Sequence, residues 1–132
     1  MEISATVRSS AHDHAVTVQS GAARQSLPIP AKPAGRGSAV NGGEFLMLAL
    51  ATCYCNDLYR EADRLGLPID DVEVEASADF DGIGLAATNV CYRATVVSTA
   101  PGPAIAHLLR HTDAVAEVHN TLRSGVSVTR VA

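Results

Sequence analysis

The chain has 132 residues, a formal net charge of −4, few aromatic side chains and no tryptophan. This length suits one domain whose core is built mainly from alanine, valine and leucine. The acidic balance and the lack of a basic cluster argue against binding to nucleic acid. Three cysteines are too few for a disulfide framework, and the N-terminus does not resemble a signal peptide, so we expect a cytoplasmic protein with reduced thiols.

Residues 2–30 are predicted to form the N-terminal strands. Apolar and polar side chains alternate in two short runs, at 3–7 and 15–19, with turn residues between them. Such alternation with short spacers predicts two or three strands joined by hairpins. The next stretch, 31–41, is rich in proline, glycine, alanine and serine, which predicts an irregular loop within the domain.

A long central helix is predicted at 42–66. Its first half, 45–55, is an almost unbroken apolar run, and apolar residues then recur at helical spacing between charged ones. Asn41 and Glu44 have the spacing of a capping box, and Gly66 is a typical stop signal. The apolar run of about 11 residues is too short to span a bilayer, which needs roughly 20, so no membrane partner is expected.

The segment 71–98 predicts a β-hairpin after this helix. Apolar side chains alternate with acidic or polar ones along its first strand, and one face should carry Val72, Val74, Ala76, Ala78 and Phe80. Arg93 on the returning strand is expected to face an acidic neighbour across the hairpin. Short helices are predicted within 103–122, and the renewed alternation at 125–131 predicts a last strand.

The order of these elements predicts an α+β fold, with an antiparallel sheet wrapped around the long central helix. Residues 1–132 are expected to form a single domain. A helix that is apolar on all sides must be covered on all sides, and one sheet covers only one of them. A second copy of the chain is the simplest source of the missing cover, so we predict a homodimer.

Three stretches, taken in order, resemble the OsmC/Ohr family. They are G-G-E-F-L-M-L-A-L-A-T-C at 42–53, R-L-G-L-P-I-D-D-V-E-V-E-A-S at 64–77 and V-H-N-T-L-R-S-G-V-S-V at 118–128. The resemblance covers most of the chain from Asn41 onward. It implies an intertwined homodimer whose central helices pack together, with a site on each side of the interface and no cofactor.

The resemblance also implies thiol-dependent reduction of organic hydroperoxides. Cys53 matches the family cysteine that attacks the peroxide and becomes a sulfenic acid. Family members hold the thiolate and the peroxide with an arginine and a glutamate. Glu44 is the match for the glutamate, although many members place it one residue earlier. Arg8, Arg24 and Arg36 are the candidates for the activating cation, because Cys53 lies too far into the helix to be activated by its dipole.

The second cysteine of the family is absent from its usual place. Where members commonly carry Cys-Pro before Val-Ser or Val-His, this chain has Ala116 and Glu117 before Val118 and His119. A sulfenic acid on the first cysteine would therefore need a small external thiol as its reductant. Cys91, on the returning strand, is expected to be a structural residue and not a replacement for the missing cysteine.

Several of these residues also have a purely structural interpretation. Cys53 suits a small buried core thiol, and Cys55 faces away from it on the helix, where it should pack in the core. Glu44 either caps the helix or, if the chain bends back or the partner subunit supplies it, serves the site. His107 and His111 have the spacing of metal ligands, but no third ligand accompanies them, so no metal site is expected.

We therefore expect a thiol peroxidase with Cys53 in an interface pocket lined by Phe45 and Met47, with His119 close by. Such a pocket would favour small apolar peroxides over hydrogen peroxide. The alternative is a non-catalytic protein of the same fold that binds a small apolar ligand at the dimer interface. A cation near Cys53 would favour the enzyme, and a pocket without one would favour the binding protein.

Overall fold

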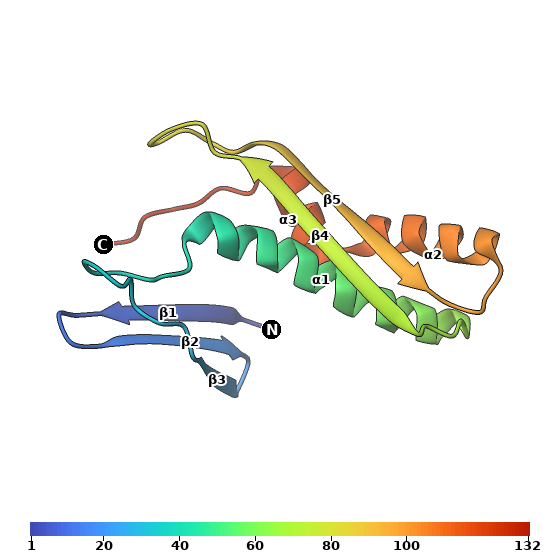
Figure 1. Cartoon of the computed structure of the whole chain (residues 1–132), viewed down its shortest axis with the longest axis horizontal. Helices are drawn as coiled ribbons and strands as arrows, with labels where there is room; N and C mark the ends of the chain where they lie inside the picture. Colours follow the sequence, from blue (N-terminus) through green and yellow to red (C-terminus); the bar gives the residue numbers. More distant parts are fainter. The chain divides into compact units, whose positions relative to one another are not determined.

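The computed structural model describes all 132 residues, and its chain divides into two compact units, residues 1–45 and 46–132. The elements comprise five strands and three helices (Figure 1). Every pair of neighbouring strands is antiparallel. The predicted α+β class with antiparallel sheet is therefore confirmed.

The first unit is built on a three-stranded sheet in the order β1-β2-β3. Its strands are β1 (Ile3–Ser9), β2 (His14–Ser20) and β3 (Ala23–Leu27), with a hairpin turn between each pair. Val16, in the middle strand, is the one buried hydrophobic side chain of this sheet. An irregular loop follows, in which one isolated bridge pairs Ala31 with Ser38.

Helix α1 (Gly42–Leu65) begins and ends with the signals that its sequence carries. The backbone N–H of Asn41 donates to Glu44 Oε1 at 3.1 Å, and the N–H of Glu44 donates to Asn41 Oδ1 at 2.8 Å. These two bonds form a capping box. At the other end Gly66 has a positive φ of 68°, and the N–H of Leu67 donates to the carbonyl of Ala62. This Schellman motif stops the helix.

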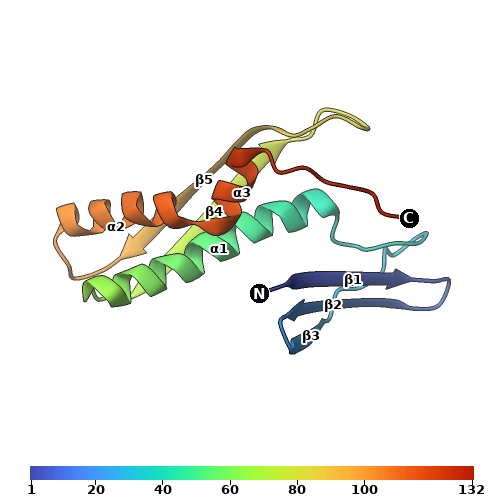
Figure 2. The ribbon, with the colours of Figure 1, turned by 180° about the vertical axis from the view of Figure 1, so that it is seen from behind.

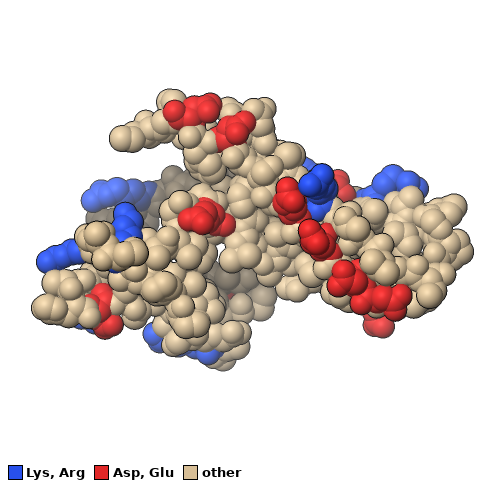
Figure 3. Space-filling view, in the orientation of Figure 1, with Lys and Arg blue, Asp and Glu red and all other residues tan.

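The second unit adds a hairpin, β4 (Asp71–Asp79) and β5 (Thr88–Val97), and two helices, α2 (Gly102–Val115) and α3 (Glu117–Ser124). Exposed and half-buried residues alternate along β4, and Figure 3 shows acidic side chains in a row along this strand. Glu75 lies opposite Arg93 across the hairpin, with 3.4 Å between Oε2 and Nη2. The predicted acidic neighbour of Arg93 is therefore confirmed.

The core of the second unit lies between this hairpin and the helices α1 and α2 (Figures 1 and 2). Its buried members are Tyr54, Leu58, Ala62, Leu108 and Ala116. The inward side chains of β4 and β5 pack against this cluster. The hydroxyl of Tyr54 donates to the carbonyl of Leu109 at 2.7 Å, so the buried phenol is satisfied and α1 is tied to α2.

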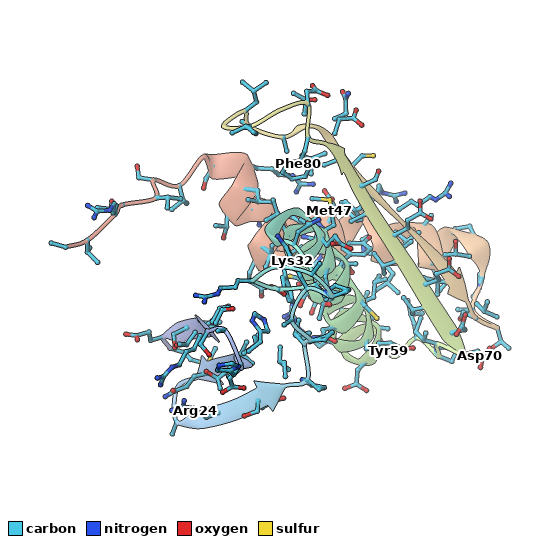
Figure 4. The ribbon with its side chains drawn as sticks, turned by 60° about the vertical axis from the view of Figure 1, so that its left-hand side comes forward. Arg24, Lys32, Met47, Tyr59, Asp70 and Phe80 are labelled. Atoms are coloured by element: carbon cyan, nitrogen blue, oxygen red, sulfur yellow. The ribbon has the colours of Figure 1, made fainter.

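Two local predictions differ from the structure. No strand forms at 125–131, because no segment of the chain pairs with it, and Val126, Val128 and Val131 are exposed. Phe80, predicted on the inward face of the hairpin, is instead 53 % exposed, and Figure 4 labels its position. The strand β4 ends at Asp79 after a shift of register, so Phe80 lies beyond the part of the chain where inward and outward residues alternate. None of the three helices combines the length and the apolar character that crossing a bilayer requires.

The core assignment makes a prediction about stability. Leu58 is fully buried, whereas Leu65, at the end of the same helix, is 46 % exposed. Truncation of a buried leucine removes apolar contacts and leaves a cavity, so Leu58→Ala should lower the free energy of unfolding by about 2–5 kcal/mol. Leu65→Ala should lower it by less than about 1 kcal/mol. Urea unfolding followed by circular dichroism measures both, and equal losses would contradict the assigned core.

Candidate functional site

The thiol of Cys53 lies at the edge of the core, half-buried, and faces the junction between α2 and α3. Its Sγ is 3.6 Å from Oδ2 of Asp57, one turn further along α1. It is also 3.8 Å from Oε2 of Glu117, the first residue of α3. Both distances suit a bond in which the S–H donates to a carboxylate oxygen, so two acidic groups from different helices meet at one sulfur.

The guanidinium of Arg60 holds the other oxygen of each carboxylate. Its Nη1 is 2.9 Å from Oδ1 of Asp57 and 3.2 Å from Oε1 of Glu117. Its Nε is 3.1 Å from Oε2 of Glu61, which is buried. Each of the two carboxylates at Cys53 thus presents one oxygen to the cation and the other to the thiol. Arg60 therefore holds both carboxylates in a fixed orientation toward the sulfur, as a residue behind a reactive group commonly does.

The electrostatics of this cluster favour the protonated form of the thiol. Burial raises the pKa of Cys53, and the charges of Asp57 and Glu117 raise it further, whereas the backbone N–H of Val118 acts in the opposite direction. Burial and the neighbouring Glu117 also raise the pKa of Asp57. The pKa of Glu117 is lowered by its own backbone N–H and by a hydrogen bond with Asp57, so its carboxylate stays ionised at neutral pH.

The junction between α2 and α3 is where the sequence predicts the missing second cysteine. Ala116 occupies that position, has an extended backbone and is completely buried in the core cluster against which Cys53 packs. Glu117, the next residue, contacts the thiol. The structure therefore brings this junction and Cys53 together, with a carboxylate at the sulfur where the family resemblance implies a second thiol nearby.

The donor atoms of this cluster also have the proximity that a metal site needs. The sulfur of Cys53 and one carboxylate oxygen each from Asp57 and Glu117 lie within 4.8 Å of one another. A thiolate with two carboxylates is a donor set that suits a divalent ion such as zinc. His107 and His111, the histidines with ligand spacing, are not part of this group. The ring of His111 instead bonds Oε1 of Glu61 through Nε2 at 2.8 Å.

Glu44 lies apart from Cys53 on the same helix. Glu44 is engaged in the capping box and, nine residues before Cys53, stands about 13 Å away along the helix axis. Arg8, Arg24 and Arg36 lie exposed in the first unit. Met47 is half-buried near the start of α1 (Figure 4), and Phe45 is half-buried two positions before it. Among the remaining cysteines Cys55 is half-buried, and Cys91 is exposed beside Ser77.

Sequence reasoning missed three residues of the site, namely Asp57, Arg60 and Glu117. Asp57 was detectable, because it lies four positions after Cys53 and side chains at that spacing share one helix face. Glu117 was detectable from its place beside Ala116. Arg60 was detectable in the same way, because it lies seven positions after Cys53 in the same helix, a spacing that also keeps to one face.

A family model described as OsmC-like protein matches residues 35–130 of the chain. Solved structures with the same fold include an OsmC-like protein from Mycoplasma pneumoniae. It is 18% identical, with a TM-score of 0.61, and the match covers 94% of this chain and 87% of that chain. No curated protein sequence matches the chain.

Two further similar structures carry names that refer to hydroperoxides. An organic hydroperoxide resistance protein OsmC from Legionella pneumophila is 17% identical, with a TM-score of 0.63 and coverage of 97% of this chain and 93% of that chain. An organic hydroperoxide resistance protein from Elizabethkingia anophelis is 16% identical, with a TM-score of 0.63 and coverage of 97% and 92%. At these identities the likeness establishes the fold.

The carboxylates beside Cys53 predict a specific change in its reactivity. Asp57→Asn removes a charge that disfavours the thiolate, so the pKa of Cys53 should fall and alkylation at neutral pH should become several-fold faster, at about tenfold per unit of pKa. The measurement is the rate of iodoacetamide alkylation against pH, in a chain with Cys55 and Cys91 changed to serine. Asp63→Asn, an exposed change on the same helix, should leave the profile unaltered. A slower reaction of the Asp57 variant would contradict the assigned electrostatics.

Proposed function

Because the chain belongs to the OsmC-like family, we propose that it reduces organic hydroperoxides through Cys53 and that a small external thiol restores the enzyme. The observation that carries the proposal is the position of the Cys53 thiol at the α2–α3 junction. Its sulfur contacts one carboxylate from α1, that of Asp57, and one from α3, that of Glu117. A cysteine packed only as a core residue has no need of two acids and a shared guanidinium.

The first step oxidises the sulfur and reduces the peroxide. The thiolate of Cys53 attacks the outer oxygen of ROOH, a sulfur–oxygen bond forms, and the O–O bond breaks. The thiol proton ends on the departing alkoxide, so that Cys–SH and ROOH give Cys–SOH and ROH. Since the raised pKa of Cys53 leaves the sulfur mostly protonated at neutral pH, a base must accept that proton during the attack.

Glu117 is the best placed residue for this proton transfer. Its pKa is lowered, so its carboxylate is ionised at neutral pH, and its Oε2 faces the sulfur. Arg60 holds Oε1 of the same carboxylate and Oδ1 of Asp57. In this mechanism the guanidinium positions both acids and offsets part of their charge. It takes the place that the sequence resemblance gave to Arg8, Arg24 or Arg36.

The second step needs a thiol from outside the chain. Ala116 cannot condense with a sulfenic acid, so a small thiol R′SH attacks Cys–SOH to give a mixed disulfide and water. A second R′SH then releases Cys–SH and R′SSR′. Packing of Cys53 against the apolar core supports a preference for apolar peroxides over hydrogen peroxide.

We extend the proposal to a homodimer. Leu48 and Tyr59 on α1 are 56 % and 47 % exposed, although an apolar helix normally buries such side chains. The alternating residues at 125–131 have no strand to pair with in their own chain, and exposed apolar segments of this kind are typical of interfaces. A second chain would cover these surfaces, and the mass of the protein in solution tests this part directly.

A second candidate function follows from the two carboxylates that contact the Cys53 sulfur, because negative charges there disfavour the thiolate and raise the pKa of the thiol. A thiol that stays protonated is a poor nucleophile, so the same fold would then serve as a binding protein for a small apolar ligand. The two functions differ in whether Cys53 is consumed by peroxide.

Turnover of cumene hydroperoxide with dithiothreitol tests the enzyme directly. Cys53→Ser should reduce turnover to the background rate, because the proposed mechanism uses that sulfur alone, whereas Cys55→Ser and Cys91→Ser should retain most of it. Dimedone should trap one sulfenic acid per chain, and peptide mass spectrometry should locate it at Cys53. Unchanged turnover in Cys53→Ser would overturn the site, and a stable disulfide between Cys53 and Cys91 would overturn the role of the external thiol.

Restoring the missing cysteine gives a sharper test of the junction geometry. Since Ala116 is buried in the cluster against which Cys53 packs, Ala116→Cys should place a second thiol close to the first. One equivalent of peroxide should then produce an intramolecular disulfide in place of a dimedone-reactive sulfenic acid. Ala114→Cys, an exposed change on α2, should leave the sulfenic acid open to dimedone. The same outcome in both variants would show that the junction does not deliver a second cysteine to Cys53.

A further inference from the structure

A pocket of about 480 Å³ lies in the second unit, and Cys53 does not line it. Its walls combine apolar side chains from α1, β5 and α3 with several polar ones, among them Tyr92, whose hydroxyl is already bonded to Asp113. The apolar group includes Leu46, Leu50, Val90 and Leu122, and the polar ones also include His119 and Arg123. This size and lining are typical of sites that hold small molecules.

His119 is the unusual member of the pocket wall. Only 3 % of the residue is exposed, and neither ring nitrogen has a hydrogen-bond partner. The ring packs against Tyr92 and Tyr54, with centroids 4.5 Å and 5.7 Å away. A buried polar group without a partner is costly, and most such groups in folded proteins are satisfied. An unpaired imidazole in a pocket wall is therefore a group that a ligand can complete, once a small shift of the wall brings one of the two covered nitrogens to the pocket surface.

The charges around the pocket indicate which head group fits. Burial, followed by the charge of Arg123, lowers the pKa of His119, so its ring is neutral and offers one donor and one acceptor. Arg123 is already paired, with Nη2 2.7 Å from Oδ1 of Asp113. The pocket thus presents a neutral hydrogen-bonding group and no uncompensated charge.

We propose that this pocket binds a small apolar alcohol, with the hydrocarbon body against the leucine and valine side chains and the hydroxyl on the ring of His119. An alcohol can donate to one imidazole nitrogen or accept from the other, as the neutral ring requires. Reduction of an organic hydroperoxide also yields an alcohol, but binding here does not depend on that chemistry. The site therefore stands or falls separately from the peroxidase activity.

Two probes that differ only in the hydroxyl test the proposal, namely 2-phenylpropan-2-ol and isopropylbenzene. Titration of the full chain with each, followed by NMR of its leucine and valine methyl groups, gives the dissociation constants and the binding place. The alcohol should bind about fivefold or more tightly than the hydrocarbon, as expected for one added hydrogen bond. Shifts should concentrate on Leu46, Leu50, Val90 and Leu122. The Cys53→Ser variant should bind both probes as the wild type does.

Three variants separate the hydrogen bond from the cavity. His119→Phe should lose the preference for the alcohol and keep the affinity for the hydrocarbon, while its melting temperature stays level or rises because an unpaired polar group is removed. Ala87→Leu, which fills the pocket from its wall, should weaken both probes. His107→Phe, an exposed change on α2, should alter neither. Equal affinities of the two probes for the wild type, or an unchanged preference in His119→Phe, would overturn the proposal.

Discussion

Packing of one face of α1 is the constraint on which the rest of the site depends. Leu50, Tyr54 and Leu58 recur every fourth residue, so they share a face, and all three are buried. Cys53 and Asp57 each precede one of these residues and therefore lie on the adjoining face, at the edge of the core. The hairpin and α2 pack on the buried face of α1. This packing places the Cys53 thiol and the Asp57 carboxylate beside the α2–α3 junction.

Features that depend on neighbouring residues could be predicted from the sequence. The capping box needs only Asn41 and Glu44, and the structure contains both of its hydrogen bonds. The alternation along β4 similarly defines its inward face as far as the strand continues. The bond between Arg93 and Glu75 followed from the hairpin alone, because a hairpin brings its two strands into register.

Features that depend on distant residues could not be predicted in this way. Arg60 and Glu117 are 57 positions apart, and only the packing of α1 against the helix junction brings them together. Spacing could not show which arginine approaches the thiol, so Arg8, Arg24 and Arg36 stood as the candidates from the N-terminal half. The segment at 125–131 shows a related limit, because alternation reveals that it can form a strand but not whether a partner strand is available. A strand forms only where a second segment pairs with it, and within this chain no segment pairs with 125–131.

In the proposed mechanism, the presence of Ala116 and Glu117 where relatives commonly carry a second cysteine changes what the site can do after oxidation. A neighbouring thiol would convert a sulfenic acid into a disulfide within the protein, whereas a carboxylate cannot, so the oxidised sulfur must wait for a thiol from solution. The site is open to solvent on the side of Glu117, whose side chain is 65 % exposed, and of Arg60, which is 43 % exposed. A small anionic thiol would meet the Glu117 carboxylate on this path. Three carboxylates, those of Asp57, Glu61 and Glu117, share the single Arg60 guanidinium, so for the proposed mechanism we expect a neutral or cationic reductant to react faster than an anionic one.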